Sequence, residues 1–171
     1  MVNIIIPVYK ARETLPKTLD SLVNQTKSLF WVTIIQDCDG ESYADIIQEY
    51  TRRGIHITLL STVENSGPGV ARQIGINNTK MCDYIMFLDS DDMLMPRAIE
   101  VLYHEAKSHD ADVVLSSFII EQNGHTSTVC SPSNTPVTWC HGKIYKLDYL
   151  LQHNIQFLPS LRLNEDAYFN L

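Results

Sequence analysis

The chain has 171 residues, of which 44% are apolar and 19% are charged. This is the composition of an ordinary globular domain, and it excludes disordered, collagen-like and disulfide-stapled proteins. Twenty acidic against thirteen basic residues give a formal charge of −7, which disfavours nucleic acid and anionic lipid as partners.

The chain lacks a run of about 18 apolar residues, so no transmembrane segment is expected. The start of the chain has no basic region and too short an apolar run for a signal peptide. We therefore expect the mature chain to begin at Met1 and to work in the cytoplasm. The cysteines are far apart in sequence, which predicts isolated reduced thiols at Cys38, Cys82, Cys130 and Cys140.

Short apolar runs alternate with segments of helical periodicity along most of the chain. The apolar runs predict strands over residues 2–7, 31–35, 55–60, 84–88 and 113–120. Helices are predicted over 15–23, around 46–50, after 67–69, from Pro96 onward and over 146–152. Residues 122–136 are rich in Ser, Thr, Asn, Gly and Pro, which is typical of a loop. This order predicts one α/β domain, with a Rossmann-like, mostly parallel sheet flanked by helices on both faces.

Acidic residues follow the ends of two predicted strands. In an open parallel sheet, ligands bind beyond the carboxyl ends of the strands. The topology therefore gathers five carboxylates on one rim, namely Asp37, Asp39, Asp89, Asp91 and Asp92.

Three of these carboxylates lie within the four residues 89–92. At a separation of roughly 5 Å and an effective dielectric constant near 20, each pair repels by about 3 kcal/mol. A divalent cation would remove that repulsion, and oxygen ligands favour Mg²⁺ or Mn²⁺. The alternative is a simple turn in which one aspartate caps the next helix.

The segment Asn65–Arg72 is a glycine-containing turn that leads into a helix. Helix N-termini attract anions, and Arg72 lies close enough to reach a phosphate. The segment is neither a Walker loop nor a dinucleotide fingerprint. The alternative is an ordinary helix start with Arg72 on the surface.

Fewer signals come from the C-terminal part. Glu165 and Asp166 are adjacent, so on a helix only one of them is expected to face a site; the alternative role is complementation of the helix dipole. The six histidines are scattered and are predicted to lie on the surface. Trp139 and Tyr145 fit the aromatic walls of a sugar site and core packing equally well.

Taken in order, these segments resemble the inverting family 2 glycosyltransferases of the GT-A fold. The resemblance rests on Ile4–Tyr9 with Leu15–Thr26, Ile34–Asp39, Asn65–Ile76, Phe87–Asp92, Gly142–Tyr145, and Ile155–Phe157 through Phe169. Three positions depart from the family pattern: Gln36 stands where many members have Asp, Gln73 stands in place of Asn, and Asp39 is the third. Asp39 replaces a common Ser, so Asp37 is the choice for reading the base.

The resemblance implies a nucleotide-sugar donor, most often a UDP-sugar, and an acceptor hydroxyl on a glycan or other molecule, as in cell-surface polysaccharide biosynthesis. Contacts to the donor nucleotide are implied for Pro7, Tyr9, Asp37, Arg72, Asp89 and Asp91. Binding of Mn²⁺ or Mg²⁺ is implied for Asp91 and Asp92, with Asp89 near the metal or the ribose. Asp166 is the implied catalytic base, with Glu165 as second choice.

Family members usually carry a further C-terminal stretch on the acceptor side, whereas this chain ends five residues after Asp166. We therefore expect residues 1–171 to form a single catalytic domain that lacks that extension. The oligomeric state does not follow from the sequence.

Three other functions are compatible with an α/β domain of this kind. A sugar-phosphate nucleotidyltransferase would need a glycine-rich loop after the first strand, and residues 7–12 contain no glycine. A phosphatase would need an aspartate nucleophile there, which is also absent. A nucleotide-sugar-binding module that has lost catalysis would bind donor and metal without transfer, and it remains the alternative.

Overall fold

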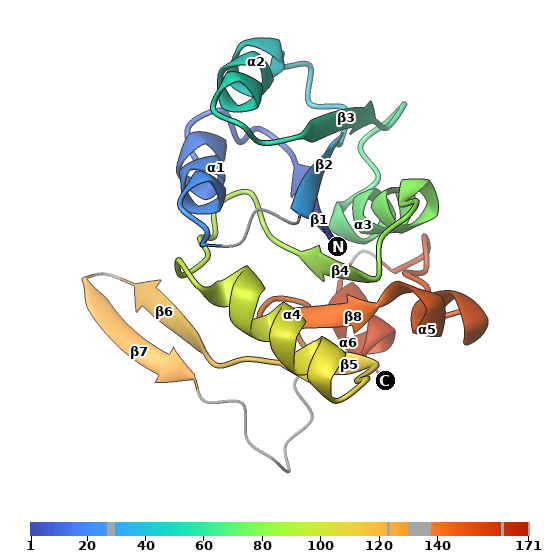
Figure 1. Cartoon of the computed structure of the whole chain (residues 1–171). Helices are drawn as coiled ribbons and strands as arrows, with labels where there is room; N and C mark the ends of the chain where they lie inside the picture. The colour runs from blue at the N-terminus through green and yellow to red at the C-terminus, as the bar shows by residue number, and fades with distance from the viewer. Residues whose placement is uncertain (27–29, 123, 130–137, 162, 171) are drawn as a thin grey trace.

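The computed structural model describes residues 1–26, 30–122, 124–129, 138–161 and 163–170. Six strands form the main sheet in the order β3-β2-β1-β4-β8-β5, and β6 and β7 form a separate hairpin (Figure 1). The strands are β1 Val2–Val8, β2 Phe30–Gln36, β3 Ile57–Ser61, β4 Tyr84–Phe87, β5 Val113–Leu115, β6 Phe118–Gln122, β7 His125–Val129 and β8 Lys143–Lys146. The helices are α1 Leu15–Val23, α2 Ala44–Arg52, α3 Pro68–Asn78, α4 Ala98–Ser108, α5 Leu147–Gln152 and α6 Glu165–Phe169.

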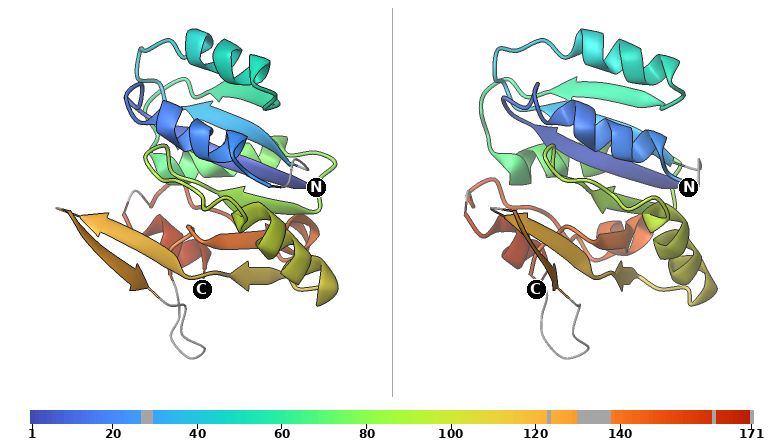
Figure 2. Two further views of the ribbon diagram at one scale, coloured as in Figure 1. Left: turned by 60° about the vertical axis from the view of Figure 1, so that its left-hand side comes forward. Right: turned by 90° about the vertical axis from the view of Figure 1, so that its left-hand side faces the viewer.

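The main sheet has a hydrophobic core on each face. Successive residues of β1 point to opposite faces: Ile4 and Ile6 enter the core covered by α1, α2 and α4, and Ile5 enters the core covered by α3, α5 and α6. Figure 2 shows these two helical layers on either side of the sheet. All seven residues of β1 are buried, as its continuous apolar sequence predicts. The α/β fold class is therefore confirmed.

Helix α3 lies unusually close to the sheet. A Cβ atom at Gly75 would collide with the side chain of Ile5 on β1, so only glycine allows this approach. Gly67, just before the helix, has a φ of +88°, a conformation that glycine adopts without strain. These two glycines fix where the N-terminus of α3 meets the carboxyl ends of the strands.

The predicted elements are confirmed as far as α4, within a few residues at their ends. The predicted strand over 113–120 is wrong in extent: it breaks after Leu115, and Phe118 begins β6 of the hairpin. The predicted loop over 122–136 is wrong where β7 pairs with β6, and 130–137 lies outside the described residues. Strand β8 was not predicted because its four residues gain their structure from pairing with β4 and β5.

The direction of β8 decides which segments meet. β1, β2, β3 and β4 are parallel, so their carboxyl ends share one edge of the sheet. β8 runs antiparallel to β4 and β5, so the residues that precede β8 lie at that same edge. No described helix is long and apolar enough to cross a bilayer.

Candidate active site

A cavity of about 630 Å³ lies at the edge of the sheet where the parallel strands end. It is lined by Pro7, Val8, Tyr9, Asp37, Asn65, Gly67, Pro68, Arg72, Asp89, Ser90, Asp91, Trp139, His141, Glu165 and Asp166. Every residue predicted to contact the donor or to act as the base is therefore at this cavity. Of the predicted rim carboxylates, Asp39 and Asp92 are not among the lining residues.

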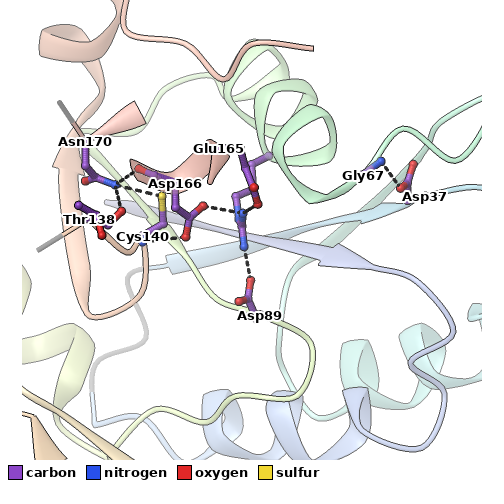
Figure 3. Close-up of polar contacts among 9 residues, drawn as sticks. Asp37, Gly67, Asp89, Thr138, Cys140, Glu165, Asp166 and Asn170 are labelled. Carbon is purple, nitrogen blue, oxygen red and sulfur yellow. Dashed lines mark hydrogen bonds and ion pairs between the residues drawn. The ribbon is translucent and has the colours of Figure 1, made fainter. Parts of the chain in front are cut away.

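Asp37 joins the end of β2 to the turn before α3. Its Oδ1 accepts hydrogen bonds from Thr62 Oγ1 and from the Ser66 backbone N–H, both at 2.9 Å. Its Oδ2 accepts a hydrogen bond from the Gly67 N–H at 2.7 Å (Figure 3). Asp37 is only 3% exposed, so its carboxylate rigidly holds the N-terminus of α3 against the sheet while lining the cavity.

Asp39 has a structural role instead. Its carboxylate accepts hydrogen bonds from Tyr43 Oη and Gln36 Nε2, each at 2.6 Å, and from the backbone N–H groups of Lys10 and Glu41. Burial alone would raise the pKa of Asp39, but these four hydrogen bonds outweigh it and lower the pKa to about 2. Asp39 thus ties the loops after β1 and β2 together.

Arg72 is the central cation of the site. Its Nη2 lies 2.6 Å from Asp89 Oδ1, and its Nη1 lies 2.8 Å from Asp166 Oδ1 and 3.3 Å from Glu165 Oε1. The alternative of a surface arginine is wrong, because Arg72 is only 4% exposed. Burial would lower its pKa, but Asp89 and Asp166 raise it, so the guanidinium is charged at all accessible pH.

Asp166 is held from three sides. Arg72 contacts its Oδ1, the Cys140 backbone N–H donates to its Oδ2 at 3.0 Å, and Asn170 Nδ2 donates to its backbone carbonyl at 2.7 Å. Asn170 Nδ2 also donates to the Thr138 carbonyl at 3.0 Å, so α6 is joined to the segment before β8 (Figure 3). This fixed carboxylate has lone pairs left to accept a further proton donor.

The expectation that only one of Glu165 and Asp166 faces a site is wrong. Both line the cavity, and both reach Nη1 of Arg72. The reason is that the pair begins the five-residue helix α6, where the buried guanidinium lies between the two side chains. Gly69 on α3 allows this approach, because a Cβ there would lie 3.0 Å from Glu165 Cγ.

The carboxylates after β4 have different surroundings. Asp89 is paired with Arg72, whereas Asp91 is exposed and lines the cavity. The pKa of Asp92 is raised, mainly because neighbouring protein atoms shield its carboxyl group from water and to a smaller extent because Asp89 and Asp91 repel its charge. Among the described residues, no three His, Cys, Asp or Glu side chains form a cluster that could hold a metal ion.

Sequence reasoning missed His141, which was predicted to lie on the surface. It lines the cavity beside Trp139, with ring centroids 5.2 Å apart and planes 27° from parallel. The sequence allowed either a sugar-site wall or core packing for Trp139 and Tyr145. Trp139 is 46% exposed at the cavity, whereas Tyr145 is 3% exposed and packs in the core. The missing signal was the direction of β8, which brings 139–142 to the site.

The cysteines agree with the predicted reduced thiols where the structure describes them. Cys38, Cys82 and Cys140 are free, and Cys130 lies outside the described residues. Burial, together with the nearby Asp166, raises the pKa of the Cys140 thiol to about 12. Cys140 is thus a buried packing residue, and its backbone N–H also donates to the carboxylate.

Comparison with known proteins extends these observations. Residues 3–160 match the family described as Glycosyl transferase family 2. The chain belongs to this family. The chain is 33% identical, over 73% of its length, to the poly(ribitol-phosphate) beta-N-acetylglucosaminyltransferase TarP of Staphylococcus aureus. It is 28% identical, over 99% of its length, to a poly(ribitol-phosphate) beta-glucosyltransferase of Bacillus spizizenii. The family predicted from the sequence is thereby confirmed.

Solved structures of low sequence identity share the fold of this family 2 chain. S. aureus TarS 1-349 in complex with UDP superposes with a TM-score of 0.85 at 22% identity, over 99% of this chain and 53% of that one. The mannosyltransferase PcManGT from Pyrobaculum calidifontis, in complex with GDP-Man and Mn²⁺, gives 0.73 at 14% identity, over 98% and 50%. The chain spans 29% of the B. spizizenii relative and 38% of TarP.

Proposed function

We propose that this chain is the catalytic domain of an inverting glycosyltransferase that moves a sugar from a nucleoside diphosphate, most simply UDP, to an acceptor hydroxyl. One observation carries the proposal: the cavity of a family 2 chain is lined by Asp37, Asp89, Asp91 and Asp166, with Asp37 beside the turn before α3 and Asp166 on α6 (Figure 3). The named relatives that glycosylate poly(ribitol-phosphate) support a polymer with free hydroxyls as the acceptor.

The donor nucleoside occupies the wall formed by the ends of β1 and β2 in this proposal. Pro7 and the half-exposed Tyr9 offer apolar surface for the base and ribose, and Asp37 offers carboxylate oxygens. TarS, which shares the fold, was crystallised with UDP and with UDP-GlcNAc, and this supports the choice of uridine.

Asp89 and Asp91 are the two carboxylates after β4 that line the cavity, and they would hold a divalent cation together with the diphosphate of the donor, because the protein alone offers no cluster of three such ligands among its described residues. The donors after β4 are carboxylate oxygens, which suit Mg²⁺ or Mn²⁺. Asp92 would lie beside the ion. When bound, the ion would neutralise charge that develops on the departing diphosphate.

The transfer step assigns the proton to Asp166. The acceptor oxygen forms its bond to the anomeric carbon as its hydroxyl proton passes to the Asp166 carboxylate. The bond between that carbon and the diphosphate breaks from the opposite side, and the diphosphate leaves with the electron pair. Arg72 and the Cys140 N–H hold the carboxylate in one orientation, so little reorganisation accompanies the transfer.

Isothermal titration with UDP, with and without Mn²⁺, tests the donor site. We expect metal-dependent binding that Asp91→Ala abolishes. Asp148→Ala removes an exposed carboxylate on α5, away from the cavity, and should leave binding unchanged. UDP binding of the same affinity with and without Mn²⁺, and in Asp91→Ala, would contradict the proposed site. Binding without transfer to any acceptor would favour the non-catalytic module.

A further inference from the structure

Three aromatic rings form a cluster on the Asp166 side of the cavity. Phe118 at the start of β6 lies edge-on to His141 at 4.5 Å and 89°, and to Trp139 at 5.6 Å. Trp139 stacks on His141. Trp139 and His141 line the cavity, and Phe118, which is not among the lining residues, contacts both rings. We call Trp139 and His141 the aromatic wall.

The backbone holds this wall in place. The Ser116 N–H and hydroxyl both donate to the Gly142 carbonyl, at 2.8 and 3.0 Å. Gly142 has a φ of +70°, and a Cβ there would lie 3.3 Å from the Ser116 carbonyl oxygen. The turn that carries His141 is therefore fixed against the end of β5, so the wall is a preformed surface.

The wall adjoins the carboxylate assigned as the base. Cys140 lies between Trp139 and His141 in sequence, and its N–H donates to Asp166 Oδ2. The nucleoside wall, at Pro7, Tyr9 and Asp37, comes from other strands. A molecule resting on the aromatic wall would place its hydroxyls beside Asp166, which is the position of an acceptor.

The charge of the cavity selects among acceptors. Five carboxylates line it, and the one guanidinium among its described lining residues, Arg72, already contacts three of them. A phosphate group at the wall would face Glu165 and Asp166 at short range and would be repelled. A neutral sugar ring instead offers hydroxyl donors to the carboxylates and an apolar C–H face to the indole.

We infer that Trp139, supported by His141 and Phe118, is the stacking platform for a neutral pyranose ring of the acceptor. This rests on the proposed function and goes further, because it distinguishes a sugar ring from a polyol phosphate as the group next to the base. Trp139 is a specificity-determining residue, and Asp166 remains the proton acceptor. The edge contacts from Phe118 restrict the rotation of both rings.

Tryptophan fluorescence tests the platform without relying on transfer. The chain has two tryptophans, and Trp31 lies near the N-terminal end of β2, at the opposite edge of the sheet from the cavity. A Trp31→Phe variant leaves Trp139 as the only indole. With UDP and Mn²⁺ present, we expect a saturable change in emission on titration with methyl pyranosides of glucose, galactose, mannose or N-acetylglucosamine. Ribitol 5-phosphate should produce none.

A kinetic measurement gives the second readout. Trp139→Leu should raise the KM for the responding glycoside about two- to tenfold, with the affinity for UDP unchanged. Trp139→Tyr keeps an aromatic face and should recover most of that loss. Trp31→Phe is the matched aromatic substitution outside the cavity and should leave the KM unchanged.

The outcomes separate the two proposals. Intact UDP binding with no fluorescence response to any glycoside would overturn the platform and leave the proposed function standing. A response to ribitol 5-phosphate alone would overturn the choice of a neutral ring. Loss of UDP binding in every metal condition would instead overturn the donor site, on which the platform depends.

Discussion

The two ends of the cavity are built by different rules. At the nucleoside end, Pro7, Tyr9 and Asp37 each stand at or just beyond the carboxyl end of a parallel strand. At the other end, Trp139 and His141 precede an antiparallel strand, and Asp166 lies on a five-residue helix. Strand order therefore locates the first group from sequence, whereas the second group is located only by tertiary pairing.

Arg72 joins the two ends. Arg72 lies on α3, the helix whose N-terminus Asp37 holds against the sheet. Its guanidinium contacts Asp89 through Nη2 and the Glu165–Asp166 pair through Nη1. Through this side chain, the helix beside the donor wall is tied to the carboxylate that we assign as the base.

The largest expected effect separates chemistry from donor binding. Asp166→Asn keeps the shape of the side chain but removes its basicity, so kcat should fall by about 10²- to 10⁴-fold. The affinity for UDP, measured by calorimetry, should change little because Asp166 lies at the far end of the cavity from Asp37. Glu165→Gln serves as the comparison and should cost less. Near-normal turnover by Asp166→Asn would show that the base is another group.

Breaking the join between the two ends should cost stability. Arg72→Gln leaves three carboxylates without their buried cation, and we expect a loss of about 3 kcal/mol in the free energy of unfolding, measured with urea. Arg97→Gln removes an exposed pair with Glu100 and should change stability by less than about 0.5 kcal/mol. Equal small effects for both variants would show that the three ion pairs contribute nothing to the fold.

Acid should weaken the link that Asp39 makes between the loops after β1 and β2. Its folded pKa, about 2, lies below the ordinary value of 3.8, so its contribution is complete above the ordinary value and is lost as the pH falls toward 2. We expect this loss to reach about 2 kcal/mol, and Asp39→Asn should flatten that part of the curve of unfolding free energy against pH. An unchanged slope in the variant would show that other carboxylates cause the acid sensitivity.

The smallest expected effect comes from disturbing the close contact between Gly69 on α3 and Glu165 on α6. Gly69→Ala places a methyl group 3.0 Å from Glu165 Cγ, so α6 or its side chain must shift by a few tenths of an ångström. We expect kcat to fall, by at most about tenfold, with the affinity for UDP retained. Asn77→Ala, at an exposed position on the same helix, is the control. A fall in UDP affinity without a change in kcat would contradict this division of roles.

Much of the nucleoside end could be predicted because local sequence determines it. The buried strands β1, β2 and β4 are mainly apolar runs; Asp37 directly follows β2, and Asp89 follows β4 after one residue. Arg72 could be placed near the start of a helix, but its burial could not, because burial depends on carboxylates 17 and 94 residues away in sequence.

The sequence by itself determined the alternation of strands and helices, the family, and the carboxylates at the carboxyl ends of the parallel strands, because apolar periodicity and strand order are local properties. Only the tertiary structure decided that β8 runs antiparallel, that 113–120 divides between two sheets, and that Trp139 and His141 line the cavity. The physical reason is that a four-residue strand has no pattern of its own, and its place and direction come from hydrogen bonds to β4 and β5.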